Sequence, residues 1–102
     1  MILTTTNSVE DYKILEYICI VSGNAVNVQT TKMTFNMQKY YAAISESISE
    51  VREQAFAQLK ENAEKLNANA VVGINVDVEL TASNYVTVNI TGTAVSILKK
   101  KV

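Results

Sequence analysis

The stretch that decides the fold is ISESISEVREQAFAQLKENAEKL, residues 44–66. Its apolar side chains recur at steps of three or four residues, at Ile44, Ile48, Val51, Ala55, Leu59, Ala63 and Leu66. That spacing follows the period of about 3.6 residues of an α-helix, and glutamates and lysines occupy the opposite side. The sequence therefore predicts one long amphipathic helix that buries its apolar stripe against another element.

The limits of this helix are set by the residues around it. It begins between Asn36 and Ile44, and Asn67 or Asn69 can close it in place of a glycine, since asparagine tolerates the left-handed region. From Asn36 the helix would be about 46 Å long, whereas a compact domain of this size has a radius of gyration of only about 13 Å. We therefore expect either a break near serines 45, 47 and 49 or a helix that overhangs its own domain.

Two stretches before the helix read as strands. Ile2–Thr6 is short and rich in β-branched residues, and Ser8–Asp11 follows it as a turn. Ile14–Val26 is the first long strand, with apolar residues on both of its faces. A strand of this kind needs cover on both sides, and this chain has only one long helix to provide it.

Two more strands follow the helix. Ala70–Leu80 alternates apolar and polar residues, as a half-buried strand does. Thr81–Asn84 is a hairpin connection, and Tyr85–Leu98 is the last long strand, in which the apolar parity switches at Gly92. Such a switch indicates a bulge or a change of partner.

This order of elements predicts a single α+β domain over residues 1–102. We expect a two-layer β-α-β-β subunit with a short extra N-terminal strand. The three long strands form a sheet of order 1-3-2, in which the strand after the hairpin lies in the middle. One helix covers one face of this sheet and leaves the other face naked.

The first long strand also predicts a subunit contact. Its even face carries Ile14, Glu16, Ile18 and Ile20, and we expect that face to cover the helix stripe. Its odd face then has no cover within the chain, and an uncovered apolar face is typical of an interaction surface. We therefore predict that Tyr17, Cys19 and Val21 lie in the contact between copies of a homo-oligomer.

Composition excludes several functions. Nine basic and ten acidic residues give a net charge of −1. The chain therefore lacks the excess of positive charge with which a domain binds nucleic acid. With no His and one Cys, the chain cannot form a soft-metal site of its own, and the usual base for a Ser or Cys nucleophile is absent. We expect no enzyme, no cofactor and no membrane partner, a solvated tail at Lys99–Lys101 and a cytoplasmic location.

The remaining polar and aromatic candidates leave two functions open. The glutamates 46, 50 and 53 on the helix and the acids Asp77 and Glu79 on one strand face read first as solvated surfaces. Aromatic side chains could line a ligand cleft between subunits, and the candidates are Tyr12, Tyr17, Phe35, Tyr40 and Tyr41. The chain is thus either a structural or interaction module without catalysis, with a protein partner, or an oligomeric protein that binds a small molecule, or a metal, at subunit interfaces.

Four short motifs, in order and in spacing, carry a resemblance to a known family. They are Thr4-Thr5-Thr6-Asn7, Glu16-Tyr17 with Ile20-Val21-Ser22-Gly23, Ala68-Asn69-Ala70-Val71-Val72-Gly73, and Thr91-Gly92-Thr93-Ala94-Val95. Together they resemble the YbjQ-like family, which is labelled "putative heavy-metal-binding", over nearly the whole chain. The motif residues matched one by one are Thr4, Thr5, Thr6, Asn7, Asn69, Gly73 and Gly92.

The resemblance implies a dodecin-like subunit and a ring, a pentamer, in which strands of neighbouring subunits join. It implies no established activity, and the metal label comes with no obvious ligand set. The chain departs from the family pattern at Cys19 and at Asn67, where the family commonly has glycine. It also departs over residues 27–41, where a Gly-rich stretch before the helix is missing.

Overall fold

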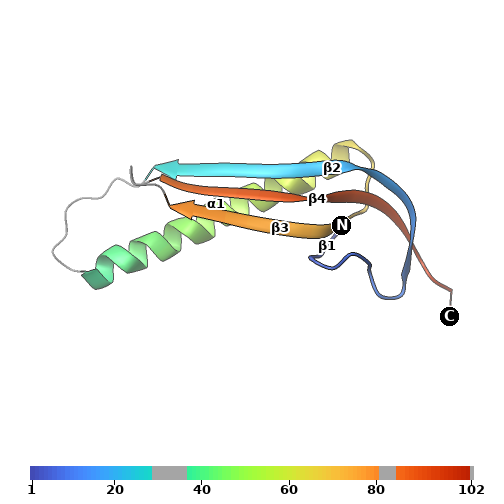
Figure 1. The fold of residues 1–102 in the computed structure, drawn as a ribbon, viewed down its shortest axis with the longest axis horizontal. Helices are drawn as coiled ribbons and strands as arrows, with labels where there is room; N and C mark the ends of the chain where they lie inside the picture. The colour runs from blue at the N-terminus through green and yellow to red at the C-terminus, as the bar shows by residue number, and fades with distance from the viewer. Residues whose placement is uncertain (29–36, 81–84, 102) are drawn as a thin grey trace.

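The computed structural model describes residues 1–28, 37–80 and 85–101, and it has the expected α+β architecture (Figure 1). Its elements are β1 (Ile2–Leu3), β2 (Tyr12–Val28), α1 (Met37–Lys65), β3 (Ala70–Leu80) and β4 (Tyr85–Lys99). The sheet has the order β1-β3-β4-β2, so the three long strands are arranged as expected. The short β1 adds a fourth strand, parallel to β3, that the order 1-3-2 did not include. The hairpin Thr81–Asn84 and the candidate Phe35 lie outside the described residues.

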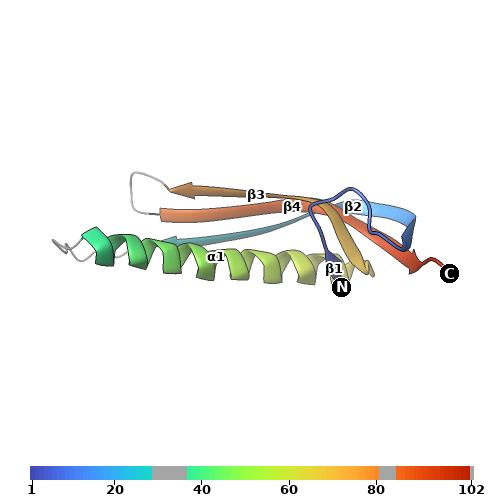
Figure 2. The same cartoon turned by 90° about the horizontal axis from the view of Figure 1, so that it is seen from below.

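The helix α1 runs without a break through serines 45, 47 and 49. Its 29 residues correspond to about 43 Å at ~1.5 Å per residue. Figure 2 shows that its N-terminal turns extend past the distal end of the sheet, where β2 and β3 end and β4 begins. Of the two alternatives, the overhanging helix is therefore correct.

The end of α1 is closed by Asn67, as the sequence indicated. Asn67 has a positive φ of 61°, which places it in the left-handed region. The N–H of Asn67 donates to the carbonyl oxygen of Glu64, and that of Ala68 donates to Ala63. This pair of bonds is the Schellman arrangement, in which an asparagine here replaces the more usual glycine.

The main core lies between α1 and the sheet. The helix contributes Val51, Ala55, Leu59 and Ala63, all of them buried, and β4 contributes Val86, Val88, Ile90 and Ala94. At Gly23 of β2 the helix backbone approaches so closely that an added Cβ would collide with the carbonyl oxygen of Ala55 and lie 2.7 Å from the amide nitrogen of Leu59. A residue without a Cβ is therefore required for this packing distance.

A second, smaller core lies on the other face of the sheet, at the proximal end where β2 begins and β4 ends. Ala70, Val72, Val95 and Ile97 are buried there under Ile2, Val9 and Tyr12. The parity switch at Gly92 marks this change from one core to the other. The associated bulge lies opposite Gly92, in β3, where the register shifts between Val72 and Asn75 and Gly73 has a φ of 61°.

The assignment of the two faces of β2 was right for Ile18 but wrong for Val21 and Ile20. Val21 is only 6% exposed and packs in the core beneath α1, beside the partly buried Ile18, whereas Ile20 is 77% exposed. Two register shifts against β4, at Ile14/Glu16 and Tyr17/Cys19, interrupt the alternation of side chains. Because each shift inserts a residue, even and odd positions change faces along the strand.

Candidate functional site

The motif residues at the N-terminus and in β3 meet at one junction. After β1, the carbonyl oxygens of Thr4 and Thr6 accept hydrogen bonds from the N–H groups of Ile74 (3.1 Å) and Gly73 (2.8 Å). The N–H of Thr4 donates to the carbonyl oxygen of Val71 at 3.0 Å. The N-terminal segment therefore pairs with the outer edge of β3 through the bulge.

Asn69 ties the end of the helix to β4. Its side-chain Nδ2 donates to the carbonyl oxygen of Ile97 at 2.8 Å, and its Oδ1 accepts from the N–H of the same residue at 2.7 Å. Its main chain bonds Val95 and Ile2 at 3.2 Å each. The side chain of Asn69 thus pairs with Ile97 as a residue of a neighbouring strand would, and both its donor and its acceptor are used.

The other motif residues act through packing. A Cβ on Gly92 would press on Val71 and Ile74 across the sheet, and a Cβ on Gly73 would lie 3.3 Å from Oδ1 of Asn7. The structure thus brings together the residues singled out by the resemblance, apart from the exposed Thr5. The hydroxyl groups of Thr4 and Thr6 and the amide of Asn69 bond one another or the backbone, so this junction holds the N-terminal segment on the sheet.

Away from the junction, the face of the sheet opposite the helix is polar and exposed. Asp77 and Glu79 lie on this face beside Asn89 and Thr87 of β4, their partners in the register. The two acids are exposed, as expected, and so are the helix residues Glu46, Glu50 and Glu53. The face of the sheet that the helix leaves uncovered is therefore polar and solvent-exposed, not apolar, in its distal half.

The two edges of the sheet differ in their cover. At the outer edge of β2, the N–H of Asn24 donates to Oε1 of Gln58 at 2.6 Å, and Nδ2 of Asn62 donates to the carbonyl oxygen of Ser22 at 2.8 Å. The helix therefore covers the middle of β2. No pattern in the sequence pointed to these two amides, because Gln58 and Asn62 look like ordinary polar residues beside the helix stripe.

The edge of β3 beyond the bulge has no such cover. β1 pairs with β3 only at Ala70 and Val71, and the N-terminal segment reaches as far as Ile74. From Asn75 to Leu80 no strand among the described residues pairs with the outer side of β3. Val78 and Leu80 are 39% and 57% exposed on this stretch.

The predicted contact residues do not share one environment. Tyr17 is 67% exposed and Cys19 is exposed on β2, so both are available to a neighbour. Val21 is buried in the core of its own subunit and is not. The side chains of Tyr40 and Tyr41 lie outside the described part, and Tyr12 packs on the second core.

The described residues do not fit a metal centre. Among them, no three His, Cys, Asp or Glu side chains come together as a cation site requires. Cys19 has no His in the whole sequence to join it, and borderline metals such as zinc want several such ligands. Within the described ranges, no helix is long and apolar enough to cross a membrane.

A comparison with known proteins identifies the family of this chain. The model of a family described as "YbjQ_1: Putative heavy-metal-binding" matches residues 1–98. The chain belongs to this YbjQ family. The four motifs that carried the resemblance therefore indicated the correct family.

The YbjQ relatives match along their full length. A "UPF0145 protein" of Bacillus cereus is 35% identical in an alignment of 103 residues. This alignment covers 95% of this chain and 100% of the relative. Another "UPF0145 protein", of Clostridium kluyveri, is 36% identical over 105 residues and is covered to 99%. A crystal structure from Pediococcus pentosaceus, described as a protein with unknown function of the DUF74 family, shares the fold with a TM-score of 0.74 at 19% identity, covering 96% of this chain and 98% of that one.

Proposed function

We propose that this chain is the subunit of a ring-forming homo-oligomer, a pentamer in solution, that acts as a structural or interaction module without catalysis. The observation that carries the proposal is the uncovered edge of β3 at Asn75–Leu80. Natural proteins cover, charge or shorten such edges, because an exposed strand pairs readily with another chain. Here the edge carries the acids Asp77 and Glu79, but it also carries exposed apolar side chains at Val78 and Leu80.

The subunit is elongated. Its radius of gyration is 17.0 Å and its extents are 59 × 25 × 16 Å, whereas a compact domain of this length has a radius of about 13 Å. The chain exposes 7152 Å², and a compact monomer of 11.2 kDa exposes about 5,700 Å². The excess of about 1,500 Å² over a compact monomer is the surface of an elongated subunit.

The test is the mass of the protein in solution. Size exclusion coupled to light scattering at micromolar concentration should give a single species at a multiple of 11.2 kDa, and five is the expected multiple. A stable monomer would overturn the proposal. A closed oligomer with another number of subunits would correct the stoichiometry and leave the role as an assembly module in place.

The alternative function, a binder of small molecules between subunits, is favoured by one observation. Tyr17 presents most of its ring to solvent on β2, next to the exposed Leu15, and a neighbour closing over them would form an aromatic-lined cleft. Native mass spectrometry of freshly purified protein measures the number of subunits and any retained ligand together. A retained aromatic compound in stoichiometric amount would favour this alternative.

A further inference from the structure

The outer edge of β2 shows which backbone groups of the sheet point outwards. In an antiparallel pair, residues alternate between those whose N–H and C=O face the partner strand and those whose groups face away. The bonds to Gln58 and Asn62 from the helix show that the groups of Asn24 and Ser22 face away from β4. The groups of Gly23 between them therefore face β4.

The same alternation continues through β4 into β3. Gly23 pairs with Ile90, so the groups of Ile90 face β2 and those of Asn89 face β3. Asn89 pairs with Asp77, so Asp77 bonds to β4 and the groups of Val78 point outwards. By the same alternation, the uncovered edge of β3 presents the N–H and C=O groups of Val76, Val78 and Leu80.

A symmetric contact between two β3 edges is unfavourable. Asp77 and Glu79 lie on the same face of the strand, and an antiparallel pair about a two-fold axis at Val78 would bring Asp77 opposite Glu79 of the other copy. Like charges directly opposite in neighbouring strands are destabilising. No Lys or Arg in β3 is available to neutralise them.

A symmetric contact between two β2 edges is also incomplete. The helix amides already occupy this edge at Ser22 and Asn24 and divide it, so its longest uninterrupted stretch is the first half, Tyr12–Ile20. A two-fold pair of these halves would leave every β3 edge uncovered. Pairing β3 of one copy with the first half of β2 of the next covers both edges at once, and such a head-to-tail contact gives a ring when its rotation closes and an open filament when it does not.

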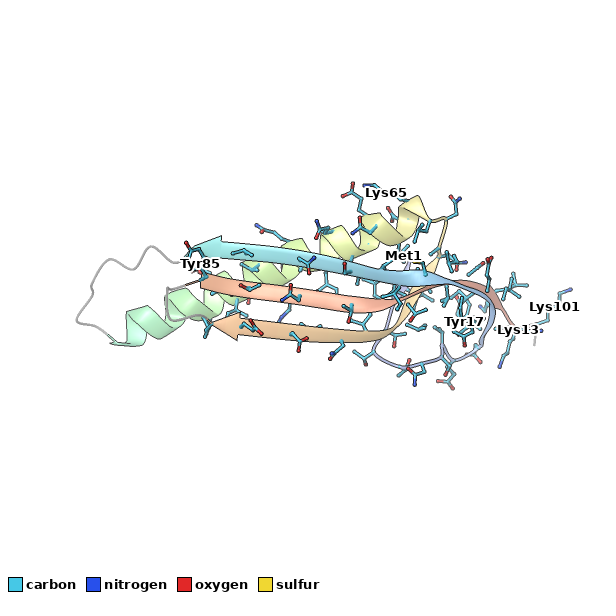
Figure 3. The ribbon with its side chains drawn as sticks, turned by 45° about the horizontal axis from the view of Figure 1, so that its top comes forward. Met1, Lys13, Tyr17, Lys65, Tyr85 and Lys101 are labelled. Carbon is cyan, nitrogen blue, oxygen red and sulfur yellow. The ribbon has the colours of Figure 1, made fainter. Side chains whose placement is uncertain are left out.

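The exposed side chains support this pairing. In the described part of the chain, ten large hydrophobic side chains are exposed, and five of them lie on these two edges: Leu15, Tyr17 and Ile20 on β2, and Val78 and Leu80 on β3. Figure 3 places Lys13 and Tyr17 at the proximal end of the sheet, together with Lys101 and far from Tyr85 at the distal end. This half of β2 carries one lysine, Lys13, and one acid, Glu16, so pairing with it does not repeat the all-acidic charge of the β3 edge at Asp77 and Glu79.

We infer that copies of this chain join head to tail, with β3 of one subunit at Asn75–Leu80 running alongside β2 of the next at Tyr12–Ile20. The two strands are parallel, because both are antiparallel to β4 within a subunit and the ring repeats one orientation. The amides of Gln58 and Asn62 confine the contact to the first half of β2. This inference rests on the proposed function and names the surfaces that carry out the assembly.

Cross-linking through the native Cys19 tests the pairing. In Val78→Cys, a flexible bismaleimide should join Cys19 of one subunit to the new cysteine of the next, giving a ladder of bands up to the full ring on a denaturing gel. The wild-type protein and the double variant Val78→Cys/Cys19→Ser should give no ladder. Leu80→Cys provides the same test at the next outward position of the edge.

Each contrary pattern has its own meaning. Dimers from wild-type Cys19 alone would indicate a two-fold contact of β2 edges, and dimers from the double variant would indicate a contact of β3 edges. Either result, or an intact oligomer in which neither Val78→Cys nor Leu80→Cys forms a ladder, overturns the inference. A protein that light scattering shows to be a monomer overturns the proposed function itself.

A proline pair tests the backbone contact independently. Val78→Pro removes only an outward N–H, so it should abolish assembly while circular dichroism still shows a folded subunit. Val26→Pro is the matched control, because the N–H of Val26 also points outwards but lies on β2 beyond the helix amides. Assembly that persists in Val78→Pro, or that is lost equally in both variants, contradicts the inference.

Discussion

The packing of α1 on Gly23 predicts a large effect from a single methyl group. In Gly23→Ala the new Cβ would collide with the carbonyl oxygen of Ala55 and lie 2.7 Å from the nitrogen and 3.0 Å from the Cβ of Leu59. Two of these atoms belong to the helix backbone, so no side-chain rotation relieves the contact. The helix must move away from β2.

The cost has two parts. Overpacking a well-filled core typically costs about 1–3 kcal/mol, and the backbone contact places this site at the upper end of that range. The hydrogen bonds of Gln58 and Asn62 flank Gly23 on β2 and lengthen as the helix retreats, at about 1 kcal/mol each. We therefore expect a loss of about 3–5 kcal/mol, out of a total stability of about 5–15 kcal/mol for a typical domain.

The assay is thermal and urea unfolding followed by circular dichroism, at one fixed protein concentration because assembly contributes to stability. At about 4–8 °C per kcal/mol, the melting temperature should fall by at least about 12 °C. The control is Ser22→Ala, which keeps the carbonyl group that Asn62 binds and should melt close to the wild type. A Gly23→Ala protein that melts within two or three degrees of the wild type would refute the close approach of helix and strand.

Three further changes test the rest of the structure. Asn69→Asp keeps the acceptor for the N–H of Ile97 but loses the donor to its carbonyl oxygen, so urea unfolding should show a loss of about 1–3 kcal/mol; an unchanged midpoint would contradict the bond. Gly73→Ala forces an alanine to a φ of 61° and should cost about 1–2 kcal/mol, whereas Gly73→Asn should cost less in the same measurement. Val21→Glu should abolish the helical dichroism of the subunit, because the carboxylate would be buried under α1, while Ile20→Glu should leave it intact; the reverse result would restore the original assignment of faces.

Periodicity was enough to predict the elements and their order. The helix and the three long strands carry long, regular patterns, and the short connection between the last two strands places the final strand in the middle of the sheet. The closing Asn67 was also recognisable, since few other residues than glycine accept its conformation. These features depend on local chemistry that a single sequence displays.

The faces of β2 could not be predicted in the same way. The bulges near Leu15 and Ile18 insert residues without any glycine or proline to mark them, so the alternation looked regular through a region where it is not. The second core was missed because Val9 lies before the turn and Tyr12 is the first residue of β2, where no periodicity is visible yet. The hydrogen bonds of Gln58 and Asn62 depend on the angle at which the helix crosses the sheet, which no local pattern encodes.

The pairing of β2 with β4 has a consequence for the order of events during synthesis. Tyr12 pairs with Lys99 and Val28 with Tyr85, so the first long strand must wait for the last one before its ladder can form. Contacts between such distant parts of a chain form slowly, and an unpaired apolar strand is prone to aggregate meanwhile. The helix is made before β4, and its Gln58 and Asn62 can occupy the outer edge of β2 as soon as it forms. The helix can therefore cover the outer edge of β2 before the permanent partner of that strand pairs with its other edge.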